Sequence, residues 1–313
     1  MATAAGIGVF DRVVARAVPL APGLIVRRLG APYVGGMTLD EALGRVADLK
    51  RDRLATTLDL LGESIEGDKA AADAADAYLA TLDALATRAL PLNISLKPSG
   101  LGSGLSWDVA TQHIDRVVAG AEELGGFVRI DMEDSSTVDA TLDLYRDLRS
   151  RGRKRVGIVL QSRLWRTIDD VLALAKLRPN VRLCKGIYLE RPQIAMQDRD
   201  AIRASFSMLL RVLLKNGSYV AIATHDEQLI VDALATIQEL GIGGDGYEFQ
   251  SLLGVRSDLA RLLARNHTVR IYVPYGSDSF AYSQRRLREN PQIAGYVARD
   301  TLRRVGRSVH LFK

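Results

Sequence analysis

The chain lacks most of the residues from which disulfide frameworks and metal centres are built. It has one cysteine, Cys184, and four histidines among 313 residues. A single cysteine excludes an intrachain disulfide framework and any thiolate-rich zinc or iron–sulfur site, and it suits a reducing compartment. The histidines, at positions 113, 225, 267 and 310, have no H-x-x-x-H or similar spacing, so we predict no metal site.

Long apolar runs are also absent. No stretch approaches the roughly 18 consecutive apolar residues that a membrane-spanning helix requires. Near the amino terminus, Asp11, Arg12 and Arg16 interrupt the segment that a signal peptide would keep apolar. We therefore predict a cytoplasmic protein without a membrane span. Residues 7–30 alternate apolar and basic positions as an amphipathic helix does, and either packing under the domain or peripheral contact with the inner face of the membrane would explain them.

Neither sign of charge is in large excess. Lys and Arg number 42 against 37 Asp and Glu, a net charge of +5 that does not call for a nucleic-acid partner. Part of the excess is local, with six basic side chains in residues 146–155 and five in residues 299–313. No aromatic residues are interleaved with the arginines of 146–155 to stack on bases, so a solvated helix end is favoured over a nucleic-acid surface. A contact of this segment with anionic lipid stays open.

Short apolar runs alternate along the chain with longer segments of helical spacing. Helices are indicated at residues 73–89, 109–124, 137–149, 167–177, 204–216, 227–240 and 258–266, with Ser106 or Asp108, Ser135 or Ser136, and Thr167 as N-caps. Strands are indicated at residues 55–61, 92–97, 127–132, 156–161, 181–185, 219–224, 247–252 and 269–275.

This alternation predicts a (β/α)₈ TIM barrel, which belongs to the α/β class. No predicted strand is followed by G-x-G-x-x-G, which weakens the alternative of a doubly wound dinucleotide-binding sheet. We divide the chain into an N-terminal helical arm, residues 1–54, and a barrel catalytic domain, residues 55–313.

The active site of such a barrel forms where the strands end at their carboxyl termini. A polar set at every predicted strand end favours a large polar ligand, although strand ends that face water are polar as well. The run at 131–134 resembles a magnesium site, but one functional carboxylate beside a capping neighbour is favoured. The polar residues are Glu63, Lys97, Asp131, Glu133, Asp134, Gln161, Arg163, Arg182, Lys185, Tyr188, Thr224, His225, Asp226, Glu248, Gln250, Tyr272 and Tyr275.

Two further patterns leave alternatives open. After the last predicted strand, Tyr282, Arg285, Arg286 and Glu289 are spaced so that they share one face of a helix. By itself this pattern is typical of an exposed, salt-bridged helix face, whereas a functional interpretation makes the two arginines a clamp on a carboxylate. Separately, Lys97 or Lys185 could form a Schiff base, as the lysine of a barrel aldolase or lyase does.

Eight segments that follow one another in the chain resemble the monofunctional bacterial proline dehydrogenases. The likeness runs from about Leu58 to Asn290 and is specific through the combination and order of the motifs. The segments are LDLLGES (58–64), ISLKPSGLG (94–102), VRIDMEDS (128–135), VGIVLQSRLWRT (156–167), VRLCKGIYLE (181–190), ATHD (223–226), YEFQSLLGVR (247–256) and RIYVPYG (270–276) with YSQRRLREN (282–290).

The resemblance implies a distorted (β/α)₈ barrel with a final helix over its mouth and with FAD bound non-covalently at the strand ends. It also implies oxidation of L-proline to Δ1-pyrroline-5-carboxylate, the first step of proline catabolism, by hydride transfer to the flavin. A membrane quinone would accept the electrons, and a pyrroline-5-carboxylate dehydrogenase would be the downstream partner.

Carried over residue by residue, the resemblance gives each candidate site residue a role. Asp131 would orient Lys97 and the polar network, and Arg182 would donate towards the reacting nitrogen edge of the flavin. Glu63 and Glu289 would offset the charge of the arginines. Lys97, Arg285 and Arg286 would hold the substrate carboxylate, and Tyr272, Tyr282 and Leu252 would wall the ring. The flavin contacts would be Met132, Gln161, Arg182, Lys185, Gly186, Ile187, Thr224 and His225.

Departures from the family pattern are small. Pro98 and Ser99 follow Lys97 in a loop that varies, and Ile187 stands where alanine is common.

Overall fold

A computed structural model describes residues 30–62, 65–279 and 282 of the chain. Eight parallel strands form a closed barrel in chain order, and β1 pairs with β8 to close it, with Leu58 opposite Val273. The predicted TIM barrel is therefore confirmed, and every predicted strand lies within two residues of an observed one. The strands are β1 (Ala55–Leu60), β2 (Asn93–Leu96), β3 (Phe127–Ile130), β4 (Val156–Gln161), β5 (Asn180–Cys184), β6 (Tyr219–Ala223), β7 (Tyr247–Leu252) and β8 (Val269–Tyr275).

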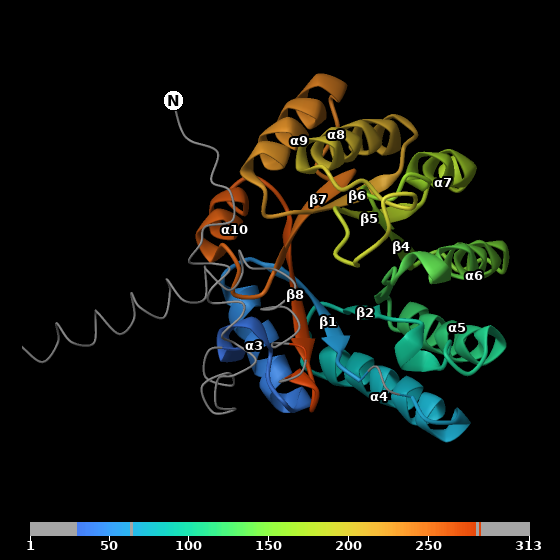
Figure 1. The fold of residues 1–313 in the computed structure, drawn as a ribbon. Helices are drawn as coiled ribbons and strands as arrows, with labels where there is room; N and C mark the ends of the chain where they lie inside the picture. Colours follow the sequence, from blue (N-terminus) through green and yellow to red (C-terminus); the bar gives the residue numbers. More distant parts are fainter. Residues whose placement is uncertain (1–29, 63–64, 280–281, 283–313) are drawn as a thin grey trace, which may run out of the picture.

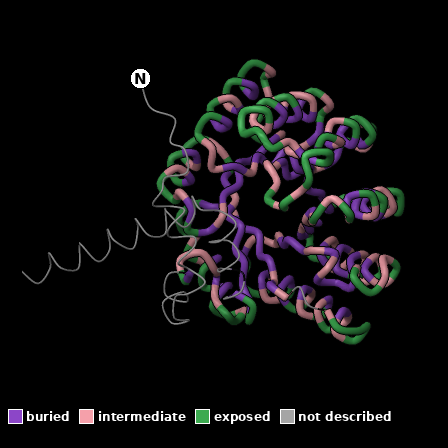
Figure 2. Tube along the Cα trace, in the orientation of Figure 1, coloured by how far each residue is buried: buried purple, intermediate pink, exposed green. Residues whose placement is uncertain are grey.

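Helices surround the strands (Figure 1). Each presents an apolar face to the barrel and a polar face to solvent, so that the buried part of the chain lies in and around the strands (Figure 2). The helices are α3 (Leu39–Arg51), α4 (Asp68–Thr87), α5 (Trp107–Glu123), α6 (Val138–Ser150), α7 (Thr167–Leu174), α8 (Arg199–Lys215), α9 (Glu227–Leu240) and α10 (Ser257–Leu263), with short 3₁₀ helices η2 (Ala31–Tyr33), η3 (Ser99–Leu101), η4 (Ser135–Thr137) and η5 (Ala175–Leu177).

The predicted N-caps are correct for one helix and wrong for two. Ser106 caps α5, because its side chain accepts a hydrogen bond from the backbone N–H of Asp108. Before α6 the cap is displaced, since the turn η4 intervenes and is capped by Asp134. Thr167 lies inside α7 as its first residue and donates its hydroxyl to the carbonyl of Gln161 instead.

Helix α3 is joined to the barrel although it precedes the first strand. Its side chains Ala42, Leu43 and Val46 are buried in the common core. Just before α3, the N–H of Gly35 donates to the carbonyl of Pro274 in β8 at 2.7 Å. The boundary at residue 54 between an arm and the barrel stays a prediction. Most of the predicted amphipathic segment at 7–30 and of the predicted final helix lies outside the described residues.

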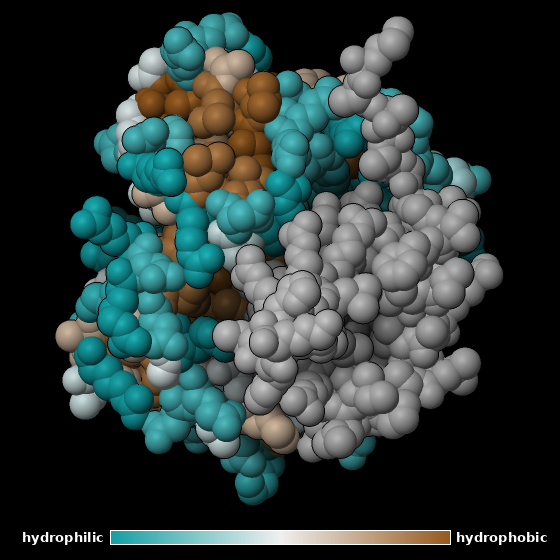
Figure 3. All heavy atoms as spheres, turned by 90° about the vertical axis from the view of Figure 1, so that its left-hand side faces the viewer, coloured by the Kyte–Doolittle hydropathy of each residue, from teal (hydrophilic) through white to brown (hydrophobic). Residues whose placement is uncertain are grey.

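The surface can be compared with the predicted absence of a nucleic-acid partner and the predicted contact with a membrane. In the segment 146–155, Arg146, Arg151 and Arg153 form ion pairs with acidic neighbours, as a solvated helix end would. The face shown in Figure 3 is largely polar where it is described, with apolar residues gathered towards the top of the view. Within the described ranges, no helix combines the length and the apolar character needed to cross a bilayer.

Candidate active site

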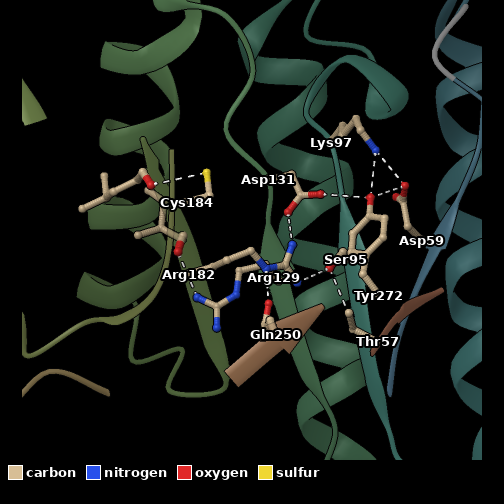
Figure 4. Close-up of polar contacts among 12 residues, drawn as sticks. Thr57, Asp59, Ser95, Lys97, Arg129, Asp131, Arg182, Cys184, Gln250 and Tyr272 are labelled. Atoms are coloured by element: carbon tan, nitrogen blue, oxygen red, sulfur yellow. Dashed lines mark hydrogen bonds and ion pairs between the residues drawn. The ribbon is translucent and has the colours of Figure 1, made fainter. Parts of the chain in front are cut away.

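The carboxyl ends of the strands bring together side chains that are far apart in the sequence. Lys97, Asp131, Arg182 and Tyr272, all predicted site residues, converge there with Asp59, which was not predicted (Figure 4). Tyr282 is also buried, and its charge contributes to raising the pKa of Tyr272. Arg285 and Arg286, predicted to hold the substrate carboxylate, and their predicted counter-anions Glu63 and Glu289 lie outside the described residues.

Asp59 and Lys97 form an ion pair at the centre of this group. The ammonium nitrogen Nζ of Lys97 donates to Oδ2 of Asp59 at 2.7 Å, and the hydroxyl of Tyr272 donates to the same oxygen. Lys97 Nζ also lies 3.4 Å from the Tyr272 hydroxyl. The Asp59 side chain is fully buried, and its Oδ1 has no hydrogen-bond partner among the described residues. A buried carboxylate oxygen without a donor is costly, so this atom is positioned to accept from a ligand or water.

Arg182 ties the opposite side of the barrel to the same group. Its guanidinium donates to Asp131 Oδ1 at 2.6 Å, to Gln250 Oε1 at 2.6 Å and to Ser95 Oγ at 2.9 Å. It lies over the ring of Tyr272, 5.3 Å from the centroid, and the Tyr272 hydroxyl is 3.3 Å from Asp131 Oδ2. The contacts form one connected network, which we call the mouth network: Lys97, Asp59, Tyr272, Asp131 and Arg182.

The protonation of the mouth network follows from its burial. Burial raises the pKa of Asp59 above its ordinary value, Lys97 opposes this shift, and Asp131 adds to it. Burial, together with Asp59 and Asp131, raises the pKa of Tyr272 well above its ordinary value. The phenol therefore keeps its proton and donates it to a carboxylate, while two cations face two carboxyl groups.

The structure alters the picture of which carboxyl group serves Lys97. Asp131 was expected to orient this lysine, but the carboxylate that directly binds it is Asp59, whereas Asp131 pairs with Arg182 and joins Lys97 through Tyr272. The sequence carried a signal for Asp59, because it is the one charged residue in the apolar strand ATTLDLL. An acid in such a strand requires a buried cation nearby.

Glu248 was wrongly placed among the mouth residues. It is the second residue of β7 and pairs with Arg270, the second residue of β8, so it lies below the mouth, towards the start of the strands, where its Oε1 accepts from Gln250 Nε2. Gln250, two residues later, does reach the mouth network through Arg182.

The residues predicted to contact flavin lie at or just after the ends of β3 to β6, except Arg182, which lies within β5. Gln161 Nε2 donates to the carbonyl of Glu133 at 2.8 Å, and Lys185 forms an ion pair with Asp226. Thr224 Oγ1 accepts from the backbone N–H of Asp226 at 3.1 Å. Met132 is buried and Ile187 is exposed.

His225 is the strongly perturbed group in this set. Its Nε2 accepts the backbone N–H of Leu252, which was predicted to wall the substrate, at 3.1 Å. Burial lowers the pKa of His225 to about 4, with Arg256 and Lys185 adding to the shift. The ring is therefore neutral at physiological pH, and because Nε2 is the acceptor its proton is on Nδ1.

The backbone conformation and the packing at position 186 also explain why this residue is glycine. Its φ is +95°, in the region that favours glycine. A Cβ there would lie 2.5 Å from Gln161 Oε1 and 2.8 Å from Arg163 Cδ. The glycine thus allows the turn after β5 to pack against the side chains that follow β4.

This set of side chains fits a flavin by its chemistry. An isoalloxazine ring has acceptor atoms along its edge and two apolar faces. Gln161, Arg182 and Lys185 supply donors from β4, β5 and the turn that follows β5, and Met132 and Leu252 supply apolar contact.

The described part of the chain contains no group of three His, Cys, Asp or Glu side chains that could hold a metal ion. In the run at 131–134, Glu133 binds Ser99 and Asp134 caps η4.

Fold and site define a class, a TIM barrel with a network of buried charges at the mouth, where barrel enzymes have their active sites. A family model described as proline dehydrogenase matches residues 42–299. The chain belongs to the proline dehydrogenase family, as its motifs predicted.

Known relatives agree with this membership. The chain is 38% identical to a proline dehydrogenase of Deinococcus radiodurans over 280 residues, 88% of this chain and 90% of the relative. It is 35% identical to proline dehydrogenase 1 of Bacillus subtilis, strain 168, over 279 residues, 88% of this chain and 92% of the relative. A bifunctional protein of Escherichia coli is 26% identical over 88% of this chain, which covers 24% of that protein.

A solved structure of similar fold is proline utilization A from Bdellovibrio bacteriovorus, inactivated by N-propargylglycine. It superposes with a TM-score of 0.80 over 90% of this chain at 23% identity. The chain spans about a third of that protein, 36% of its length, so the match supports the barrel fold.

Proposed function

We propose that this protein is an FAD-dependent proline dehydrogenase that oxidises L-proline to Δ1-pyrroline-5-carboxylate and passes the electrons to a membrane quinone. The observation that carries the proposal is the mouth network, which surrounds Lys97 with Asp59 and Tyr272 in a chain of the proline dehydrogenase family. In this proposal, Lys97 binds the carboxylate of proline, and Tyr272, Tyr282 and Leu252 enclose its ring.

The charges of the mouth network explain why further cations are needed. Lys97 and Arg182 are already balanced by Asp59 and Asp131. A substrate carboxylate would therefore enter a site with no net positive charge, unless other side chains supply it. Arg285 and Arg286 are the proposed source, with Glu63 and Glu289 as their partners, as the motif YSQRRLREN indicates.

FAD, when bound, supplies the acceptor for the hydride that leaves the ring carbon beside the nitrogen. We assign its binding to Met132, Gln161, Arg182, Lys185, Gly186, Ile187, Thr224 and His225. Arg182 is held from three sides, by Asp131, Gln250 and Ser95, so its remaining N–H groups point in a fixed direction. Such a preorganised donor stabilises negative charge without having to reorient.

The amine of proline should be neutral when it reacts, because loss of hydride beside an ammonium group would build up a second positive charge. The rate of flavin reduction by proline is therefore expected to rise with pH through a group on the bound substrate or beside it. Rapid-mixing measurements of flavin bleaching over a pH series test this. A rate that does not change with pH would contradict it.

A Schiff-base lyase or aldolase that uses Lys97 or Lys185 is the second candidate, and the geometry disfavours it. A lysine attacks a carbonyl as the free amine. Lys97 is paired with the buried Asp59, and Lys185 with Asp226. To attack a carbonyl, either lysine would have to leave the carboxylate to which it is bonded.

The deciding measurement is the visible spectrum of the purified protein before and after L-proline is added without oxygen. A flavin spectrum that bleaches supports the cofactor, the substrate and the reaction together. A flavin spectrum that proline leaves unchanged would remove the substrate from the proposal. A colourless protein that FAD cannot reconstitute, and that borohydride labels with a keto substrate, would favour the lysine enzyme.

The quinone and the downstream partner follow from the family. Electron transfer to a quinone requires a peripheral contact with the membrane, and the amphipathic segment at 7–30 is the proposed contact. Deleting this segment should abolish binding to liposomes. If binding persists, residues 146–155 become the candidate. A pyrroline-5-carboxylate dehydrogenase is the proposed consumer of the product.

A further inference from the structure

Glu133 joins two loops at the barrel mouth. Its carboxylate accepts two hydrogen bonds from one residue, from the backbone N–H of Ser99 at 2.9 Å and from the Ser99 hydroxyl at 2.5 Å. Its own carbonyl accepts from Gln161 Nε2 at 2.8 Å. Glu133, in the segment that follows β3, is thus hydrogen-bonded both to the turn that follows β2 and to a side chain at the end of β4.

The turn held by Glu133 carries Lys97. Strand β2 ends at Leu96, so Lys97 is the first residue that the strand ladder does not fix. The short helix η3 begins two residues later, and its turn is closed by bonds from Gly100 N–H to the carbonyl of Lys97 and from Leu101 N–H to that of Pro98. The N–H of Ser99, in the first turn, has no helical carbonyl to bind, and Glu133 supplies the acceptor.

The side chain of Lys97 must meet partners that come from other strands. Its ammonium lies 2.7 Å from Asp59 on β1 and 3.4 Å from Tyr272 on β8. Both partners are fixed by the sheet, so the position of the ammonium depends on the backbone of the turn. A displaced turn would therefore move the ammonium away from the position in which it can bind a carboxylate.

We propose that Glu133 is a positioning residue for the substrate carboxylate: by clamping Ser99, it holds Lys97 in line with the side of the site that Gln161 and Arg182 form. The inference rests on the proposed function, because it takes Lys97 as the residue that binds the carboxylate. Glu133 itself is not proposed to touch proline.

Three substitutions change the two hydrogen bonds between Ser99 and Glu133, which we call the clamp, to different extents. Glu133→Ala removes both bonds to Ser99. Ser99→Ala removes the hydroxyl bond and keeps the backbone bond. Glu133→Gln keeps both, because the amide oxygen can accept the N–H of Ser99 while the amide nitrogen donates to its hydroxyl.

Glu122 provides a matched control at the other end of the barrel. Its carboxylate accepts two backbone N–H groups, from Lys154 at 2.6 Å and from Arg155 at 2.8 Å, in the connection that leads into the start of β4. Glu122→Ala therefore removes a clamp of the same chemistry from a loop that carries none of the proposed site residues.

The proposal predicts a split between KM and kcat. Glu133→Ala should raise the KM for L-proline about tenfold, equivalent to about 1.4 kcal/mol of lost binding, and change kcat less than about threefold. Ser99→Ala should have a smaller effect on KM, and Glu133→Gln and Glu122→Ala should stay within about twofold of the wild type. Thermal unfolding should show that Glu133→Ala and Glu122→Ala are destabilised to a similar extent.

Binding measured without turnover provides a second readout. Tetrahydrofuran-2-carboxylate, which has an ether oxygen in place of the proline amine, can be titrated against the flavin absorption of the holoenzyme. Its Kd should weaken by the same factor as KM in Glu133→Ala. In a Lys97→Met background, Glu133→Ala should have no further effect on either constant, because the residue acts through Lys97.

Each other outcome overturns the inference. Unchanged KM and Kd in Glu133→Ala would mean that the clamp only stabilises the fold. Equal effects of Glu133→Ala with and without Lys97 would mean that it acts on another part of the site. A wild-type protein that proline does not reduce would instead refute the proposed function, and this is measured before any variant is made.

Discussion

His225 should make the protein sensitive to acid, and the size of the effect can be worked out. The ring is partly buried, its Nε2 accepts the N–H of Leu252 at 3.1 Å, and its pKa is lowered from 6.5 to about 4 by burial first and then by Arg256 and Lys185. The unfolded chain therefore takes up a proton on this residue at a higher pH than the folded protein does.

The sign of the effect follows from this order. Above about pH 6.5 neither state is protonated at His225, and the full stability is present. As the pH falls from there towards 4, protonation favours the unfolded chain. The loss from this one residue is about 2 kcal/mol at pH 5 and about 3 kcal/mol at pH 4, since one pKa unit corresponds to 1.36 kcal/mol.

The assay compares the wild type with His225→Gln by urea unfolding near pH 7.5 and pH 5. Glutamine can still accept the N–H of Leu252 but does not titrate. The wild type should lose about 2 kcal/mol more than the variant between the two pH values, or about 3 °C more in Tm for a chain of this length. Two flavin concentrations separate any change in flavin affinity. Equal losses in the two proteins would refute the burial argument.

Four other substitutions test the site, and one of them, Asp59→Asn, is made in the chain that carries another. Lys97→Met should lower the free energy of unfolding by about 3 kcal/mol by leaving Asp59 buried without a cation, and Asp59→Asn in the same chain should recover part of it in urea unfolding. Gly186→Ala should lower stability by about 1–3 kcal/mol and reduce flavin retention, measured by absorbance, because of its φ of +95° and the contact with Gln161. Tyr272→Ser should reduce the preference for proline over 4-hydroxyproline, and an unchanged ratio of kcat/KM values would show that Tyr272 does not wall the ring.

The fold could be predicted because its signals are local. Each strand is a short apolar run and each helix repeats its apolar residues on one face, so the barrel is visible in windows of a few residues. The wrong caps show the limit of this information. Ser135 and Thr167 are good capping residues, but a 3₁₀ turn precedes α6, and the Thr167 hydroxyl binds the carbonyl of Gln161. Neither feature is encoded in residue preference alone.

The site could be predicted only in part, because its contacts are not local. Lys97 and Asp59 are 38 positions apart, and Tyr272 and Asp59 are 213 apart. Resemblance to a family transfers the identity of a residue without its partners, and for this reason it located Lys97, Asp131, Arg182 and Tyr272 but missed the acid that binds Lys97.

Strand position alone also misplaces residues, because side chains differ in reach. Arg182 is third in β5 and Tyr272 is fourth in β8, and their long side chains extend to Asp131 and Asp59 at the mouth. Glu248, second in β7, is held at the start of the strands by Arg270. On sequence alone all three count as strand-end residues, and only the contacts of their side chains separate Glu248 from the other two. The pairing of opposite charges across the barrel decides which end a charged side chain serves. At the mouth two acids face two cations, so under the proposed function the carboxylate of proline would depend on cations from elsewhere in the chain.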